Sequence, residues 1–203
     1  MKKRGEPIIS PFISGCLDCA VYHIVTERDD VTVLTLPEDK RKDTEERRKF
    51  LNAADLVFLC LPDAAAMEAV SLIDNPNTRV IDASTAHRTA DGWVYGFAEL
   101  LAGQRERIKN AKRVANPGCH ASGFISTVCP LVANGVIPSE FPLTAYSLTG
   151  YSGGGKSLIA EYEAEDRDPR HGSCRIYGTT LAHKHLPEMT ALPARANTTV
   201  TGL

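Results

Sequence analysis

The sequence lacks both a long hydrophobic run and an excess of charge of either sign. No apolar stretch approaches the ~20 residues that a transmembrane helix requires. Its 23 basic and 25 acidic residues leave a net charge of −2, which gives no reason to expect nucleic acid or an anionic membrane as a partner. Pro7, Pro11 and Asp18 interrupt the stretch after the basic N-terminus, which makes it a poor signal peptide. We therefore expect a cytoplasmic protein.

The six cysteines lack the arrangement of a metal or redox centre. Thiols of a cytoplasmic protein stay reduced. Cys16 and Cys19 form a C-x-x-C pair, but no second pair accompanies it. We therefore assign this pair a structural role and expect no bound metal.

Short β-rich runs alternate with helical ones in the first half of the chain. We expect strands at 31–36, 56–60, 79–83 and 113–115, and helices at 16–26, 38–49, 64–73 and 100–110. The run at 56–60 is continuously apolar, which is typical of a strand buried on both faces. The pattern predicts an α/β fold with a parallel sheet covered by helices. Ligands of such sheets bind at the carboxyl ends of the strands.

A different pattern follows the turn Asn116-Pro117-Gly118-Cys119. The apolar run after this turn predicts a helix over about 121–134, which places Cys119 at or near a helix N-terminus. Unpaired backbone N–H groups and the helix dipole favour a thiolate at that position. Further on we expect a strand at 143–148, a glycine-rich loop at 149–156, a helix at 157–165 and no clear period over 192–203.

Four motifs occur in a specific order: IDASTAHR at 81–88, ANPGC at 115–119, GYSGGGK at 150–156 and HKHLPE at 183–188. Together they resemble the shorter class of the N-acetyl-γ-glutamyl-phosphate reductase family and the related aspartate-semialdehyde dehydrogenases. The resemblance covers roughly residues 29–190. It implies a Rossmann-like NAD(P)-binding domain over 1–118 and an incomplete α+β catalytic domain over 119–203, in a homo-oligomer.

The resemblance also implies a reaction, the NADPH-dependent reduction of N-acetyl-γ-glutamyl phosphate to the semialdehyde in arginine biosynthesis. Cys119 would displace inorganic phosphate from the acyl phosphate and form a thioester, which hydride from NADPH would reduce. His183 and His185 are two residues apart, so an extended segment would present both rings on one face. Either imidazole could exchange a proton with the thiol and the alkoxide. We favour His183, and the sequence leaves the choice open.

Binding residues follow from the same resemblance. The cofactor would contact Gly15, Pro62, Ser84 and Gly154, and the substrate would contact Arg88, Asn116, Ser152, Lys156 and Glu188. The loop at 152–156 could present N–H groups and one ammonium to an anion. Arg88 suits bidentate contact with a carboxylate or phosphate. Glu38 suits a ribose hydroxyl, whereas Lys40 or Arg41 could meet a 2′-phosphate, so the residues leave NAD and NADP open.

Two regions depart from the family's pattern. Only Gly15 stands where the family has a glycine-rich turn for the cofactor pyrophosphate, and Pro11 is expected to damage a central strand. The family continues well beyond the histidine motif, whereas this chain ends at Leu203 after an unfamiliar tail. Two alternatives therefore stay open: an inactive or cofactor-deficient fragment of such a reductase, and a cysteine-dependent acyltransferase or hydrolase without nicotinamide.

Overall fold

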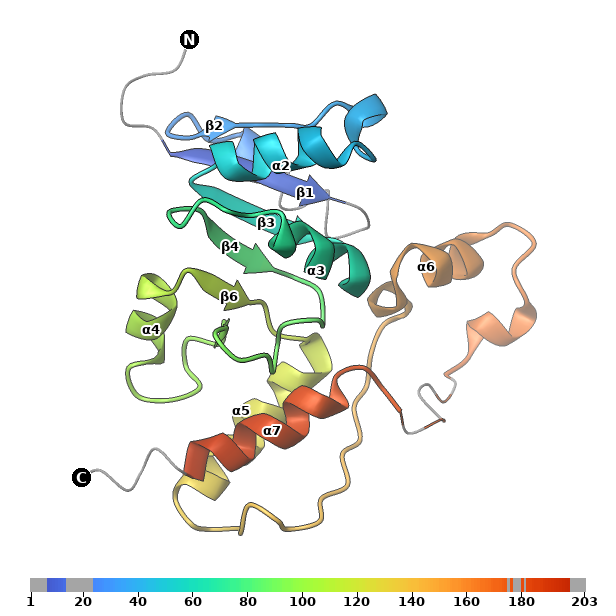
Figure 1. Cartoon of the computed structure of the whole chain (residues 1–203). Coiled ribbons are helices and arrows are strands. Elements are labelled where there is room, and N and C mark those ends of the chain that lie inside the picture. Colours follow the sequence, from blue (N-terminus) through green and yellow to red (C-terminus); the bar gives the residue numbers. More distant parts are fainter. Residues whose placement is uncertain (1–6, 14–23, 175, 177–179, 181, 198–203) are drawn as a thin grey trace.

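The computed structural model describes residues 7–13, 24–174, 176, 180 and 182–197. Its centre is a six-stranded sheet of order β2-β1-β3-β4-β6-β5, in which every neighbouring pair is parallel (Figure 1). The strands are β1 (Ile8–Ile13), β2 (Thr32–Val33), β3 (Leu56–Cys60), β4 (Arg79–Asp82), β5 (Val94–Tyr95) and β6 (Arg113–Ala115). The parallel α/β sheet predicted from the sequence is confirmed.

Helices α2 (Thr44–Ala53) and α3 (Asp63–Ser71) lie over one face of this sheet (Figure 1). A hydrophobic core is shared between these helices and the middle strands, and its fully buried members include Leu51, Val57, Leu59, Ala69 and Val80. The C-terminal ends of the two helices are joined by Asn52. Its side-chain amide donates to the carbonyl of Leu72 at 2.8 Å, and its oxygen accepts the N–H of Asn75 at 2.7 Å.

Pro11 lies inside β1, an interior strand, so the expectation that it would damage a central strand is wrong. The register explains why. In a parallel ladder alternate residues bond to opposite neighbours, and Thr32 and Leu34 donate to the carbonyls of residues 7 and 9, so residue 11 faces the β2 side. Strand β2 ends at Val33, before it reaches Pro11. The carbonyl of Leu34 accepts the hydroxyl of Ser10 instead, at 3.3 Å.

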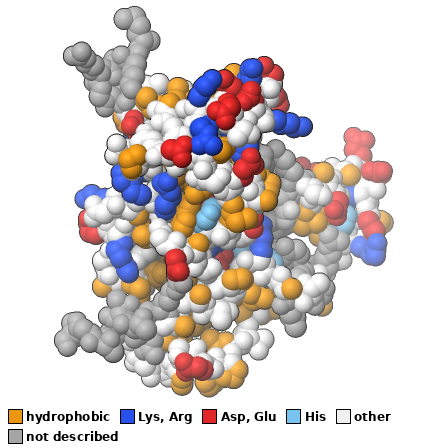
Figure 2. Space-filling view, in the orientation of Figure 1, with side chains coloured by type: hydrophobic (Ala, Val, Ile, Leu, Met, Phe, Trp, Pro, Cys, Tyr) orange, Lys and Arg blue, Asp and Glu red, His pale blue; other side chains and the backbone are white. Residues whose placement is uncertain are grey.

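Several element boundaries differ from those expected. Strand β2 is shorter than 31–36, and α4 (Gln104–Asn110) is shorter than 100–110. The expected helix at 38–49 is divided into η1 (Glu38–Lys40) and α2, because the Asp43 carboxylate accepts the N–H groups of Glu45 and Glu46 and so starts a new helix. Figure 2 shows charges of both signs gathered over α2, in agreement with an exposed helix.

Asp63 is the first residue of α3 rather than its N-cap, which is Pro62. Its side chain turns to the neighbouring strand end, where it accepts the backbone N–H of Thr85 at 2.9 Å. The expected helix at 16–26 lies mostly outside the described residues, and so do Gly15 and the Cys16–Cys19 pair.

The second half of the chain differs most from expectation. Helices α5 (Cys119–Ala133) and α7 (Leu186–Asn197) lie side by side, whereas η2 (Tyr151–Gly154), α6 (Gly155–Glu163) and η3 (Pro169–Gly172) form an arm beside them (Figure 1). The expected strand at 143–148 is wrong, since every residue from 141 to 150 is exposed and 141–150 belong to no element. Helix α7 was not expected. From residue 119 on, the described part of the chain holds helices and no strand, so no α+β domain is seen there.

Helices α5 and α7 share a second core with the loop after β5. Its buried members are Tyr95, Ala121, Ile125, Cys129 and Leu192, and it connects the carboxyl edge of the sheet to both helices. Among the described residues, no helix is both long and apolar enough to span a bilayer.

Candidate active site

Cys119 is the first residue of α5 and is exposed to solvent. It follows the carboxyl end of β6, where the N–H of Asn116 donates to the carbonyl of Asp82 at 2.7 Å and so continues the ladder into the turn. Gly118 is the N-cap of α5 and has no side chain to bond the first N–H groups of the helix. The predicted placement of Cys119 at a helix N-terminus is confirmed, and the backbone N–H groups of the first turn are available to a negative charge.

Three histidine rings gather beside this helix N-terminus. The ring centroids of His183 and His185 are 4.6 Å apart, and His120 lies 5.5 Å from His183 and 5.9 Å from His185. Residue Ser147, on the exposed segment before the arm, places its hydroxyl oxygen 2.8 Å from Nδ1 of His120. The structure therefore unites the two predicted histidines with a third one that was not predicted to act.

The two predicted histidines differ in burial. His185 is 4% exposed, and burial, followed by the charge of Arg88 and the neighbouring histidines, lowers its pKa from 6.5 to about 4. His183 is less buried; desolvation first, then the charge of His120, lowers its pKa. Its Nδ1 accepts the backbone N–H of His185 at 3.2 Å, so the neutral ring of His183 carries its proton on Nε2. Both rings are uncharged at neutral pH.

Beneath the cysteine turn lies a buried carboxylate, Glu188 of α7, which is 1% exposed. Its Oε1 accepts from Nη1 of Arg88 at 2.6 Å, and its Oε2 accepts from the Tyr95 hydroxyl at 2.6 Å and from the N–H of Gly118 at 3.3 Å. Arg88 also donates from Nε to the carbonyl of Asn116 at 2.9 Å. Burial first, and then the carboxylate, raise the pKa of Tyr95. Arg88 and Glu188, both predicted to bind substrate, thus place their charged groups against each other.

Gly118 fits only because it has no side chain. A Cβ on this residue would lie 2.6 Å from Oε1 of Glu188 and 2.6 Å from Nε2 of His185, and closer still to Nη1 of Arg88. All three distances are shorter than any contact that a carbon atom tolerates. Three charged or polar groups therefore meet against the backbone of the residue before Cys119.

Ser84 follows β4 and is buried, and its hydroxyl donates to Oδ2 of Asp82 at 2.7 Å. The same oxygen of Asp82 lies 2.6 Å from Nδ1 of His87. The ring of His87 stacks on Trp93 with centroids 4.1 Å apart. The side chain of Ser84, predicted to contact the cofactor, is thus engaged within the protein.

The other predicted binding residues lie at different places. Pro62 and Asn116 are exposed at the carboxyl ends of β3 and β6. Ser152 and Gly154 belong to η2, whose Tyr151 stacks on Tyr162 of α6 with centroids 4.8 Å apart. Lys156 lies in α6, and its side chain, like the whole of Gly15, is outside the described part of the chain.

Two residues of the site were missed by sequence reasoning, His120 and Tyr95. His120 directly follows Cys119, so its place in the motif was a usable signal. Tyr95 sits on a two-residue strand that was not predicted, and nothing in its sequence surroundings pointed to the site.

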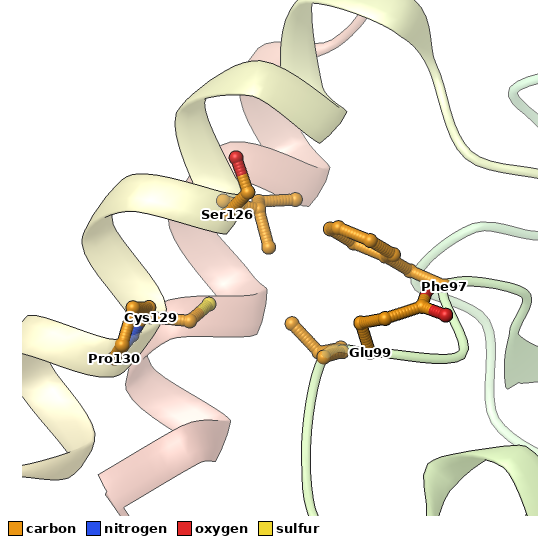
Figure 3. Close-up of a pocket in the computed structure, with 7 residues that line it drawn as sticks. Phe97, Glu99, Ser126, Cys129 and Pro130 are labelled. Carbon is orange, nitrogen blue, oxygen red and sulfur yellow. The ribbon is translucent and has the colours of Figure 1, made fainter.

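A separate small pocket of about 170 Å³ lies along the second half of α5 (Figure 3). Ile125, Ser126, Cys129 and Pro130 line it from the helix, and Phe97, Glu99 and Leu100 line it from the loop after β5. The thiol of Cys129 is buried, and burial raises its pKa to about 11. Among the described residues, no group of three or more His, Cys, Asp or Glu side chains could hold a metal ion.

Comparison with protein families defines the class of this protein. A model of the semialdehyde dehydrogenase NAD-binding domain matches residues 26–111, and a model of the semialdehyde dehydrogenase dimerisation domain matches residues 119–201. The two parts of the chain thus match the two domains of the semialdehyde dehydrogenase family. The solved structures of aspartate semialdehyde dehydrogenase II from Vibrio cholerae (TM-score 0.54, 14% identity, 95% of this chain and 66% of that one) and of aspartate semialdehyde dehydrogenase from Francisella tularensis (TM-score 0.52, 16% identity, 80% and 52%) share the fold.

Within this family, the curated relatives are named N-acetyl-gamma-glutamyl-phosphate reductase, as the four motifs predicted. The protein from Mesorhizobium japonicum is 52% identical over 177 residues, which is 87% of this chain and 57% of the relative. That from Nostoc is 48% identical over 180 residues, 87% of this chain and 56% of the relative. The chain thus spans little more than half the length of these relatives.

Proposed function

We propose that this chain carries the acyl-phosphate reductase chemistry of its relatives, the NADPH-dependent reduction of N-acetyl-γ-glutamyl phosphate to N-acetyl-glutamate semialdehyde, in the cytoplasm. The observation that carries the proposal is an exposed thiol at the N-terminus of α5 with three histidine rings beside it. The assignment of the substrate is supported by the names of relatives that are 48% and 52% identical to this chain.

In the proposed reaction, the sulfur of Cys119 bonds to the acyl carbon, and the bond from that carbon to the phosphate oxygen breaks. Inorganic phosphate leaves with the electron pair, and a thioester remains on the protein. When bound, a nicotinamide would supply hydride to the thioester carbon. The resulting alkoxide collapses to the aldehyde and returns the thiolate of Cys119, which the first N–H groups of α5 stabilise.

We assign the proton-handling role to His183 and an orienting role to His185. With a pKa of about 4, His185 binds a proton too weakly to hold one at neutral pH. His183 is less buried, and its neutral tautomer presents Nε2–H, which can stabilise the developing oxyanion. To take a proton from the thiol, His183 would accept it at Nδ1 and release the 3.2 Å contact with the N–H of His185.

The strand order of the sheet favours one place for a nicotinamide dinucleotide. After β1 the chain crosses to β2 on one side and then to β3 on the other, so the strand order changes direction between β1 and β3. Dinucleotides bind outside the carboxyl ends of strands at such a switch point. Pro62 lies at the end of β3, and α3 begins there with N–H groups that suit a phosphate. Lys40 and Arg41, near η1, would favour NADP over NAD.

We further propose a homo-oligomer and a division between domains at residues 118 and 119. The family model over residues 119–201 describes a dimerisation domain, and it begins at Cys119. The exposed apolar side chains of the 141–150 segment, among them Tyr146 at 90% and Leu148 at 84% exposed, provide a surface for such association.

The reverse reaction tests the function. N-acetyl-glutamate semialdehyde and NADP⁺ are mixed with the chain, and the absorbance of reduced nicotinamide is followed with and without inorganic phosphate. We expect that NADP⁺ is reduced only when phosphate is present, that Cys119→Ser abolishes this reduction and that Cys174→Ser leaves it unchanged. Reduction that does not need phosphate, or that survives Cys119→Ser, would contradict the proposal.

A further inference from the structure

We propose that Tyr95 is a positioning residue for Cys119, and that Tyr95, Arg88 and Glu188 form a buried clamp under the Gly118–Cys119 turn rather than a site for substrate. The inference deepens the proposed function, because it rests on Cys119 as the nucleophile. It gives the Arg88–Glu188 pair a role different from the one that the resemblance implied.

The clamp consists of three hydrogen bonds that converge on one carboxylate. Glu188 accepts from the guanidinium of Arg88 and the hydroxyl of Tyr95, both at 2.6 Å, and from the N–H of Gly118 at 3.3 Å. Arg88 is 8%, Tyr95 5% and Glu188 1% exposed. A buried carboxylate with these partners has little capacity left for a substrate group.

The clamp joins segments that are distant in the sequence. Arg88 comes from the loop after β4, Tyr95 from β5, Gly118 from the start of α5 and Glu188 from α7. Helix α7 begins one residue after His185, so holding Glu188 also holds the histidine segment against the cysteine turn. The contact of Gly118 with Arg88, Glu188 and His185, which leaves no room for a Cβ, shows where these segments converge.

Electrostatics gives the clamp a second consequence. Glu188 brings a negative charge next to the N–H groups that would stabilise a thiolate at Cys119. The charge of Arg88 and the hydroxyl of Tyr95 offset that charge. The balance among the three groups therefore sets how strongly the helix N-terminus favours the thiolate.

Two substitutions shift this balance in opposite directions. Tyr95→Phe removes a donor and leaves the carboxylate less compensated, so the pH midpoint of Cys119 alkylation should rise. Glu188→Gln keeps the shape but removes the negative charge and leaves Arg88 unpaired, so the midpoint should fall. Since a hydrogen bond to a charged group is strong, we expect at least about a threefold change in the alkylation rate at neutral pH for each variant.

The experiment measures iodoacetamide labelling of Cys119 against pH by peptide mapping, with Cys174, also exposed, as the internal reference. Tyr146→Phe, on a 90% exposed side chain, is the matched control and should leave the midpoint unchanged. Thermal unfolding reports whether each variant folds. If Glu188→Gln does not fold, the comparison of Tyr95→Phe with Tyr146→Phe is sufficient to test the clamp.

Opposite shifts would support the clamp. Shifts of the two pH midpoints in the same direction would overturn it, because general loosening of the fold moves both variants alike. An unchanged midpoint in Tyr95→Phe would also overturn it. Labelling requires neither substrate nor cofactor, so this outcome is independent of whether the reductase activity is found. In the active protein, the clamp also predicts that Tyr95→Phe lowers kcat and leaves KM unchanged, whereas loss of a substrate contact would raise KM.

Discussion

At the scale of single residues, the described cysteines occupy very different surroundings. Cys119 is exposed at a helix N-terminus, whereas Cys60 and Cys129 are buried. Burial raises the pKa of Cys129 to about 11, which leaves it almost fully protonated at neutral pH. Cys174 is also exposed and lies two residues after η3, so it is not at a helix N-terminus.

We therefore predict that Cys119 is the most reactive thiol at neutral pH. Limited alkylation with iodoacetamide, followed by peptide mapping, should label Cys119 before Cys174, and Cys129 only after unfolding. First labelling of Cys174, with Cys119 untouched, would show that the thiolate is not favoured at the start of α5.

His185 makes stability depend on pH. Its folded-state pKa of about 4 lies below the ordinary 6.5, so the unfolded chain binds a proton that the folded chain rejects. The stabilisation is present above pH 6.5 and is lost as the pH falls toward 4. A shift of this size corresponds to at most about 3 kcal/mol.

We predict that His185→Gln flattens the acid dependence. Urea unfolding at pH 7 and pH 4.5 should show a larger loss of stability for the wild type than for the variant. His171→Gln, on the arm, serves as the control and should behave as the wild type. Equal losses in all three proteins would mean that His185 is not buried as an uncharged ring.

How far the sequence could predict the site is clearest for these residues. Cys119, His183 and His185 were predicted from the order and spacing of their motifs, and the structure brings the two histidines together beside His120, the residue after Cys119. The pairing of Arg88 with Glu188 was not found, since 100 residues separate them and only the packing of α7 brings them together. Tyr95 could not be found, because a two-residue strand carries no periodic signal.

At the scale of elements, prediction was best for strands and helices with their own local signal. Strands β3 and β6 have the predicted bounds, because a continuous apolar run fixes β3 and the turn that begins at Asn116 ends β6. Helix α7 was missed because the stretch at 192–203 shows no clear period. Its position depends on contacts with α5 and on the bonds from its Glu188 to Arg88 and Tyr95. Pro11 was misjudged because its tolerance depends on where β2 ends, which sequence alone does not reveal.

Helix α7 should be held to α5 by Leu192, which is 5% exposed in the core that contains Tyr95 and Ile125. We predict that Leu192→Ala lowers the free energy of unfolding by roughly 2–5 kcal/mol, as truncation of a buried leucine does. Denaturant unfolding measures this loss. Thr190→Ala, on the exposed side of the same helix, should change stability little. Equal effects of the two substitutions would indicate that α7 is not docked.

At the scale of the whole molecule, the segment at 141–150 exposes several large apolar side chains. Phe141, Leu143, Tyr146 and Leu148 are all between 45% and 90% exposed on a backbone that lies in no helix or strand. Exposed apolar side chains on an extended backbone favour association with another chain.

We predict that the purified chain associates in a concentration-dependent manner through this segment. Sedimentation velocity should detect the association, and the double substitution Tyr146→Ser and Leu148→Ser should weaken it. Met67→Ser, at an exposed position of α3, is the control for lost surface hydrophobicity. A monomer at all concentrations would exclude the association. Equal weakening by Met67→Ser would show that the association does not depend on this segment.

The proposed function requires that Cys119 takes the acyl group of an acyl phosphate as a thioester. The direct measurement is intact and peptide mass spectrometry of the chain after mixing with N-acetyl-γ-glutamyl phosphate in the absence of nicotinamide. We predict an added N-acetyl-glutamyl group on the peptide that contains Cys119, its absence in Cys119→Ser and its loss when NADPH is added. An unmodified Cys119, or an acyl group on another residue that NADPH does not discharge, would contradict it.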